Sequence, residues 1–161
     1  MGLKYYRRKV LSGSGLVLLG RVGFVFDGDT LRVRVGIGGV VVRIWGIDAP
    51  EAGQFFFWGA RDLLCRLVGG RNVVLRVEGR DRWGRLVCRV SVASVGDVGL
   101  AMVREGGAWW YRGWARGASG LRVAQRAAVA RRVGLWAERG AVAPWLWRKR
   151  GEFRNKQGRR G

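Results

Sequence analysis

The chain has 161 residues, which is enough for one domain with a substantial core and too few for a second. Hydrophobic residues make up 48% and charged residues 26%, a globular composition, and 31 basic against 11 acidic residues give a net charge of +20 that favours a nucleic-acid partner over an anionic membrane. Two cysteines and no histidine exclude a four-ligand zinc site and a histidine-assisted nucleophile.

Residues 1–15 form a basic N-terminal segment. Lys4 and Arg7 resemble the start of a signal peptide, but glycine and serine at positions 12–15 interrupt the apolar stretch and no small-x-small cleavage site follows. No apolar run reaches the roughly 18 residues of a membrane span. We therefore expect a cytoplasmic protein that does not bind membranes, with secretion as the alternative if an upstream start is missing.

The first half of the chain predicts three strands. Residues 16–26 are apolar, residues 31–35 alternate apolar and polar, and residues 40–47 return as a third strand after the turn at Gly36–Gly39. Strands joined so closely form a meander.

The second half alternates between helix and strand. A helix is expected over residues 58–68, strands over 73–77 and 86–92, a short helix after the N-cap Asp97, and a last helix whose apolar stripe runs from Leu121 to Leu135. This order predicts a mainly β α+β protein: a five-stranded OB-type Greek-key barrel with about three helices, over residues 16–139. Residues 140–161 have no apolar periodicity left and predict a basic, flexible tail.

Four of the 11 acids lie between residues 27 and 51: Asp27, Asp29, Asp48 and Glu51. In a meander the start of the second strand and the end of the third lie at the same end of the sheet, so these acids can meet. Converging carboxylates repel one another unless a cation joins them, and oxygen ligands favour calcium or magnesium. By itself, each cluster also fits an ordinary turn or strand end.

Arginines accompany these acids. Arg43 lies in an otherwise apolar strand and requires an anionic partner or ligand, because an unpaired buried charge is costly. Arg85 follows the polar turn Asp81–Gly84. The planar fork of arginine matches phosphate oxygens, so the combined set suits phosphodiester hydrolysis.

In their order and spacing, the segments Asp27–Thr30, Arg43 with Ile47–Glu51, and Asp81–Arg85 resemble the thermonuclease (staphylococcal-nuclease-like) family. The resemblance covers about residues 16–139 and includes Gly134–Trp136, which often ends the last helix of that domain. It implies the same five-stranded OB-type barrel with three helices.

The resemblance also implies a metal site. Asp29 and Asp48 would bind one calcium ion (Ca2+), and Ala49 would add its backbone carbonyl, for which no particular side chain is needed. Asp27 would lie behind these ligands and orient the loop or a metal-bound water, or it would be a plain turn acid.

For the reaction, the resemblance implies that Glu51 is the general base and that Arg43 and Arg85 bind the phosphate. The product would be a 3′-phosphate end on DNA and/or RNA, with little sequence specificity. Tyr111 and Trp114 are candidate base-stacking residues, with core packing as the alternative.

Two other functions remain open at this stage: a catalytically inactive nucleic-acid-binding module of the same fold, and a basic protein that binds anionic membranes. The first does not explain why all the site residues are present, and the second leaves the acids unexplained. We expect a monomeric nuclease. The cations from Arg148 onward would act as a nucleic-acid tether and take no part in chemistry.

Overall fold

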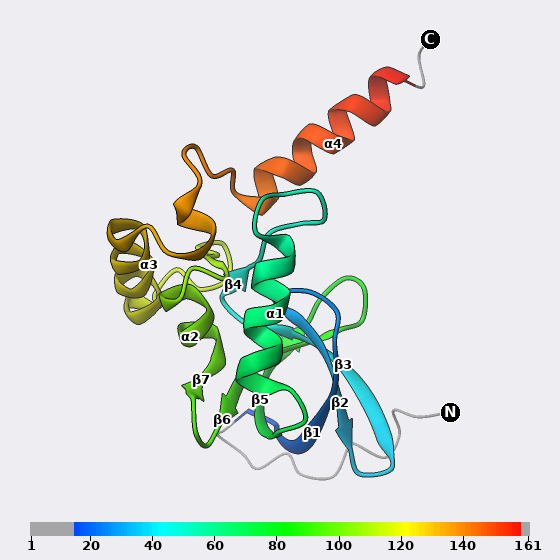
Figure 1. Ribbon diagram of the computed structural model, residues 1–161. Helices are drawn as coiled ribbons and strands as arrows, with labels where there is room; N and C mark the ends of the chain where they lie inside the picture. Colours follow the sequence, from blue (N-terminus) through cyan, green and yellow to red (C-terminus); the bar gives the residue numbers. More distant parts are fainter. Residues whose placement is uncertain (1–14, 159–161) are drawn as a thin grey trace.

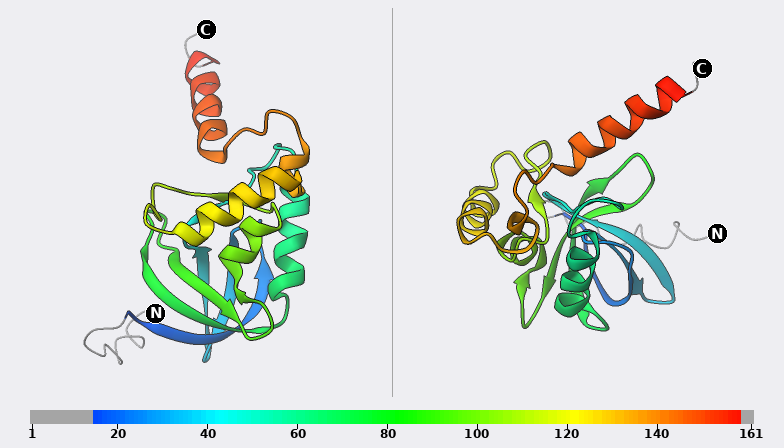
Figure 2. Two further views of the ribbon diagram at one scale, coloured as in Figure 1. Left: turned by 90° about the vertical axis from the view of Figure 1, so that its left-hand side faces the viewer. Right: turned by 45° about the horizontal axis from the view of Figure 1, so that its top comes forward.

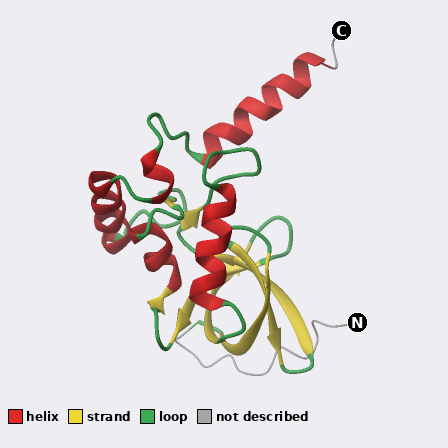
Figure 3. Ribbon diagram, in the orientation of Figure 1, coloured by secondary structure: helices red, strands yellow, loops and turns green. Residues whose placement is uncertain are grey.

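A computed structural model of the chain describes the backbone of residues 15–158 and the side chains of residues 15–151. Its main sheet is a barrel built from five long strands: β1 (Val17–Val25), β2 (Thr30–Val35), β3 (Gly38–Ile44), β5 (Asn72–Arg80) and β6 (Leu86–Val92). Neighbours in the order β3-β2-β1-β5-β6 pair antiparallel, and a parallel pairing of β3 with β6 closes the barrel. Figures 1 and 3 show this closed sheet beside the helices.

Three pairs of residues form short strands outside this set: β4 (Ile47–Asp48), β7 (Gly96–Asp97) and β8 (Trp109–Trp110). The helices are α1 (Phe57–Val68), α2 (Val98–Arg104), α3 (Ser119–Arg131), the 3-10 turn η2 (Gly134–Ala137) and α4 (Pro144–Gly158). The expected α+β barrel is confirmed. The described residues form one α-helix more than the three expected.

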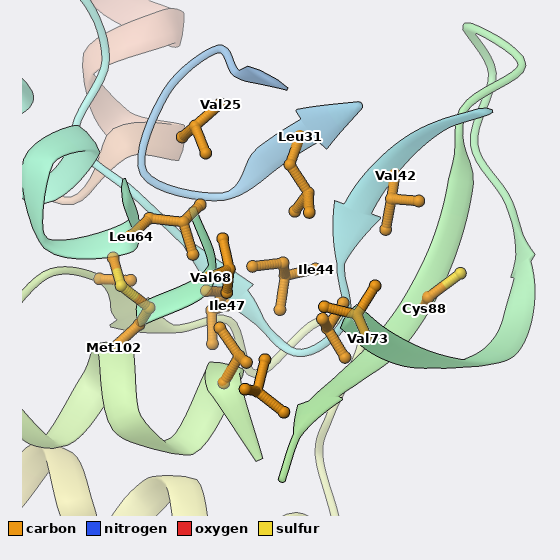
Figure 4. Packing of buried hydrophobic residues seen from close by; sticks show 14 of the residues in the cluster. Val25, Leu31, Val42, Ile44, Ile47, Leu64, Val68, Val73, Cys88 and Met102 are labelled. Atoms are coloured by element: carbon orange, nitrogen blue, oxygen red, sulfur yellow. The ribbon is translucent and has the colours of Figure 1, made fainter. Parts of the chain in front are cut away.

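The amphipathic patterns explain why these elements form. In β2, Leu31 and Val33 are fully buried while Arg32 and Arg34 face outward, as period-2 alternation requires. In α1, the buried face includes Leu64 and is set against the barrel (Figure 4). Since the core joins both sheet and helices, it fixes where the strand ends lie.

Two details of the last expected helix differ from the sequence prediction. The helix α3 ends at Arg131, because Arg132 adopts a left-handed conformation with φ of 53°. Leu135 is buried as expected, but it lies in η2 and not in α3. The N-cap prediction is confirmed, since Asp97 accepts a hydrogen bond from the Leu100 backbone N–H at 2.9 Å.

The segment 140–161, expected to be a flexible tail, contains the helix α4, whose far end extends away from the barrel (Figure 2). The basic segment 1–15 lies outside the described residues except for its last one. None of the described helices combines the length and the apolar character that crossing a membrane would require.

Candidate active site

The loop between β1 and β2 is an Asx turn. The carboxylate of Asp27 accepts hydrogen bonds from the backbone N–H groups of Asp29 and Thr30, at 3.0 and 2.8 Å. Burial and the neighbouring Asp29 raise the pKa of Asp27 to about 6. The turn expected as the ordinary interpretation therefore exists, and it also directs Asp29 inward.

Asp29 and the β4 residue Asp48 converge from the two loops, as the meander predicted. The Ala49 backbone N–H donates to Asp29 Oδ2 at 2.7 Å, which joins the loops directly, and Thr30 Oγ1 donates to Asp29 Oδ1 at 3.0 Å. Both aspartates are buried, with exposed fractions of 6% and 1%. Two carboxylates this deep require a positive partner.

Gly28 lets the two loops approach each other. A Cβ atom at this position would lie 2.7 Å from the Ala49 Cβ and 2.8 Å from the Ala60 Cβ on α1, closer than such atoms pack. The contact between the acid-bearing loops therefore depends on three small residues.

Arg43 on β3 supplies the positive partner for both aspartates. Its guanidinium forms an ion pair with Asp29 and donates from Nη2 to Asp48 Oδ1 at 2.6 Å. Burial disfavours this charge, but Asp29 and Asp48 outweigh it and hold the pKa of Arg43 above its ordinary value. The pKa of Asp48 is raised by its burial and by Asp29, although Arg148 and Arg43 oppose that shift.

Arg85, just before β6, is held by the turn that precedes it. Its Nε donates to Asp81 Oδ2 at 2.6 Å, and its Nη1 donates to Thr30 Oγ1 at 3.3 Å. Desolvation raises the pKa of Asp81, but the hydrogen bonds and the charge of Arg85 together outweigh it and keep the pKa of that carboxyl below its ordinary value. Thr30 thus connects the Asp29 carboxylate to the second phosphate-binding candidate.

All nine residues selected from the sequence line one open cavity of about 730 Å3. They are Asp27, Asp29, Arg43, Asp48, Ala49, Glu51, Arg85, Tyr111 and Trp114. Trp114 is 46% exposed, which favours a role in binding over one in the core. Tyr111 is half-buried, with its ring 5.4 Å from that of Trp145.

Arg148 on α4 is the site residue that the sequence did not indicate. It donates to Asp48 Oδ2 at 2.9 Å and forms an ion pair with Glu51. Its desolvation is outweighed by these two acids, so its pKa lies above the ordinary value. The expectation that the C-terminal cations lie away from the chemistry is wrong for this residue.

A cluster of contacts positions α4 at the cavity. Gln54 accepts a hydrogen bond from the Glu51 backbone N–H at 2.9 Å and donates to the Val142 carbonyl at 2.8 Å. Trp145 packs edge-on against Trp109 of β8, with ring centroids 5.8 Å apart. The loop that carries Glu51 is therefore tied to the start of α4.

The two aspartates suit a hard cation that takes few of its ligands from side chains. Asp29 and Asp48 both pair with the guanidinium of Arg43, so the two carboxylates face the same part of the cavity. Among the described residues no group of three or more acidic, cysteine or histidine side chains could hold a metal. The remaining ligands would have to be backbone carbonyl, water or substrate oxygens, all of which calcium accepts.

Comparison with known proteins identifies the family of the chain. The family described as staphylococcal nuclease homologue matches residues 41–138, which include Arg43, Asp48, Glu51 and Arg85. A protein from Escherichia coli named "Uncharacterized endonuclease" is 37% identical over 131 residues, covering 81% of this chain and 85% of that protein. "Protein ParB", also from Escherichia coli, is 38% identical over 159 residues, covering 92% and 89%. "Micrococcal nuclease" from Shigella flexneri is 33% identical over 139 residues, covering 81% and 80%. Since the family match, these relatives and the observed barrel agree, the chain belongs to the staphylococcal nuclease homologue family and is a nuclease.

Proposed function

We propose that this nuclease is calcium-dependent and hydrolyses DNA and/or RNA with little sequence specificity, leaving 3′-phosphate ends. The observation that carries the proposal is the meeting of Asp29, Asp48 and Glu51 with two arginines in one cavity. Carboxylates alone would suit only a metal, and arginines alone only an anion. Their combination suits a phosphodiester bound beside a cation.

Asp29 and Asp48 would hold the calcium ion, together with the backbone carbonyl of Ala49. When bound, the ion would polarise the phosphoryl group and hold a water molecule. Asp27 supports this arrangement from behind, because its two backbone hydrogen bonds fix the loop that carries Asp29.

Arg43 and Arg85 are assigned to the phosphate. Arg43 is at present the counter-charge of the two aspartates. With those acids neutralised by a cation, its guanidinium is available to donate to a phosphate oxygen. Arg85 is oriented by Asp81 and Thr30, so its fork is positioned before the substrate arrives. Both charges oppose the negative charge that grows in the transition state.

Glu51 is assigned as the general base. As the water oxygen forms its bond to phosphorus, Glu51 would accept a proton from that water and the bond from phosphorus to the 5′-oxygen would break. The leaving oxygen takes a proton from solvent, which gives a 5′-hydroxyl and a 3′-phosphate. Because Arg148 pairs with Glu51, this arginine must turn away from the carboxylate before the base can act.

Digestion of single-stranded DNA and RNA with calcium and with a chelator tests the proposal. We expect cleavage of one or both substrates only with calcium, and product ends that a phosphatase must treat before a 3′-extending polymerase can use them. Cleavage that persists in the chelator would contradict the calcium assignment. Products with free 3′-hydroxyl ends would contradict the direction of bond breaking.

A further inference from the structure

A continuous row of aromatic and arginine side chains leads away from the active-site cavity. We call it the aromatic–arginine strip, and it consists of Phe57, Trp58, Arg61, Phe24, Phe26 and Arg32. Phe57 lines the cavity, and its ring centroid lies 5.0 Å from that of Trp58. The strip therefore begins inside the site that the proposed function uses.

Arginine joins the rings into one surface. The Arg61 guanidinium lies 6.0 Å from the Trp58 ring centroid and 5.9 Å from that of Phe24. Phe24 and Phe26 meet edge to face at 5.0 Å, and Arg32 lies 5.7 Å from the Phe26 ring. These residues come from the first two turns of α1 and from the adjoining ends of β1 and β2, and α1 contacts β1.

The rings of the strip are not part of the core. Trp58 is 67% exposed, Phe24 51% and Phe26 39%, whereas core residues of the same strands, such as Val25, are buried. Single exposed apolar residues are common in proteins, but several large rings in contact mark a binding surface. The exposed part of each of these rings is therefore accessible to a ligand.

The charge around the strip selects the kind of partner. Arg32 and Arg34 face outward from β2, and Arg34 pairs in register with Arg21 of β1. Two acids lie beside the strip: Asp62, which is exposed and 3.9 Å from Arg61, and Asp27, which follows Phe26 and accepts hydrogen bonds from its own loop. A surface with this charge suits a polyanion and disfavours a purely apolar or basic protein partner.

We infer that the strip binds a single-stranded stretch of the nucleic-acid substrate as it leaves the cavity. Bases would stack on Trp58, Phe24 and Phe26, and phosphates would lie against Arg61 and Arg32. Stacking of this kind requires unpaired bases, so the strip favours single strands over duplexes. This inference rests on the proposed function only for the position of the substrate in the cavity.

Binding of fluorescently labelled oligonucleotides in calcium-free buffer tests the strip. The probes are a 12-nucleotide single strand, a trinucleotide and a duplex of the 12-nucleotide sequence. Trp58→Ala and Phe24→Ala should each weaken binding of the 12-nucleotide strand by about fivefold or more, and should leave the trinucleotide and the duplex unchanged. Trp58→Phe should restore most of the loss. Val123→Ala is the matched control, because it removes an exposed apolar side chain from α3.

Equal affinity of Trp58→Ala and the unmodified chain for the single strand would overturn the inference. So would an equal loss on the duplex, since that would indicate a surface that does not read unpaired bases. The two proposals fail separately. If the unmodified protein does not cleave nucleic acid with calcium but Trp58→Ala still weakens single-strand binding, the strip stands and the catalytic assignment fails. If the unmodified protein cleaves and Trp58→Ala has no effect on single-strand binding, the reverse holds.

Discussion

Two arginines face the same acids from different parts of the molecule. Arg43 lies on a barrel strand, its side chain is 15% exposed, and it pairs with Asp29 and Asp48. Arg148 lies on α4, its side chain is 42% exposed, and it pairs with Asp48 and Glu51. Asp48 is therefore shared between an arginine that the sheet holds in place and one that a terminal helix brings in.

The difference between the two arginines shows how buried acids can be charge-neutralised in the folded protein and still become accessible for the reaction. The backbone of Arg43 is fixed by pairings with β2 and β6, so its guanidinium stays in the cavity even when it exchanges the acids for a phosphate. Arg148 has solvent on one side and can turn away from Glu51 while Arg43 remains. We infer that Arg43 is the structural counter-charge, which stays in the cavity whether it pairs with the acids or with a phosphate, and that Arg148 is the arginine that can leave.

The largest expected effect comes from the acid that Arg148 contacts and Arg43 does not. Glu51→Gln should lower turnover about a hundredfold or more, because a general base acts chiefly in the transition state. Affinity for a single strand in calcium-free buffer should hardly change. Single-turnover cleavage and anisotropy measure the two effects. Glu138→Gln, an exposed acid outside the cavity, is the control, and an equal fall in affinity and rate would sink the assignment.

Replacing Arg43 tests whether the arginine on the barrel strand stabilises the fold. Arg43→Met should lower the free energy of unfolding by about 3 kcal/mol in calcium-free buffer, because two buried carboxylates lose their fixed partner. Urea denaturation measures this change. A loss below about 1 kcal/mol would show that Arg43 is no more structural than Arg148.

Replacing Arg148 tests whether the arginine on α4 can be lost at little cost in stability. Arg148→Met should cost less than about 1 kcal/mol of stability, as expected for a partly exposed pair. Since Asp48 would no longer be shared with this arginine, the calcium concentration at the midpoint of the thermal shift should fall, on the order of fivefold. The melting temperature reports this without any substrate. A rise in this calcium concentration would instead show that Arg148 favours calcium binding.

The smallest effect concerns the cations beyond the site. Truncation after Gly151 removes Arg154, Lys156, Arg159 and Arg160 and keeps Arg148. The slope of log affinity against log salt for a long single strand should flatten by up to about 3, because each phosphate contact on a single strand contributes about 0.7. Turnover on a saturating short substrate should stay the same. An unchanged slope would mean that these cations make no phosphate contacts.

Local pattern was enough to predict most of the fold. Period-2 alternation placed β2, and helical spacing placed α1, because both elements bury one face against the same core. The two-residue strands β4 and β8 could not be predicted, since a pairing as short as Ile47 with Trp110 leaves no periodicity. For α4, the sequence offered basic residues and no apolar stripe, so nothing local indicated a helix.

The site residues also fall into those that the sequence could predict and those that it could not. Asp29 and Asp48 were predictable because a meander returns its strand ends to one place, and the Asp81–Arg85 contact spans a single turn. Arg148 lies 100 residues from Asp48 in the sequence. Only the docking of Trp145 and Gln54 brings it to the cavity, and that docking depends on tertiary packing.

The stack of Gly28, Ala49 and Ala60 has a consequence for how such a site can be lost in the course of evolution. The spacing of the two loops that carry the acids is set by residues without a functional group. A chain could keep every acid and arginine of the cavity and still lose its activity through the gain of one methyl group at position 28. A motif search that scores only the chemical residues would count such a descendant as an enzyme.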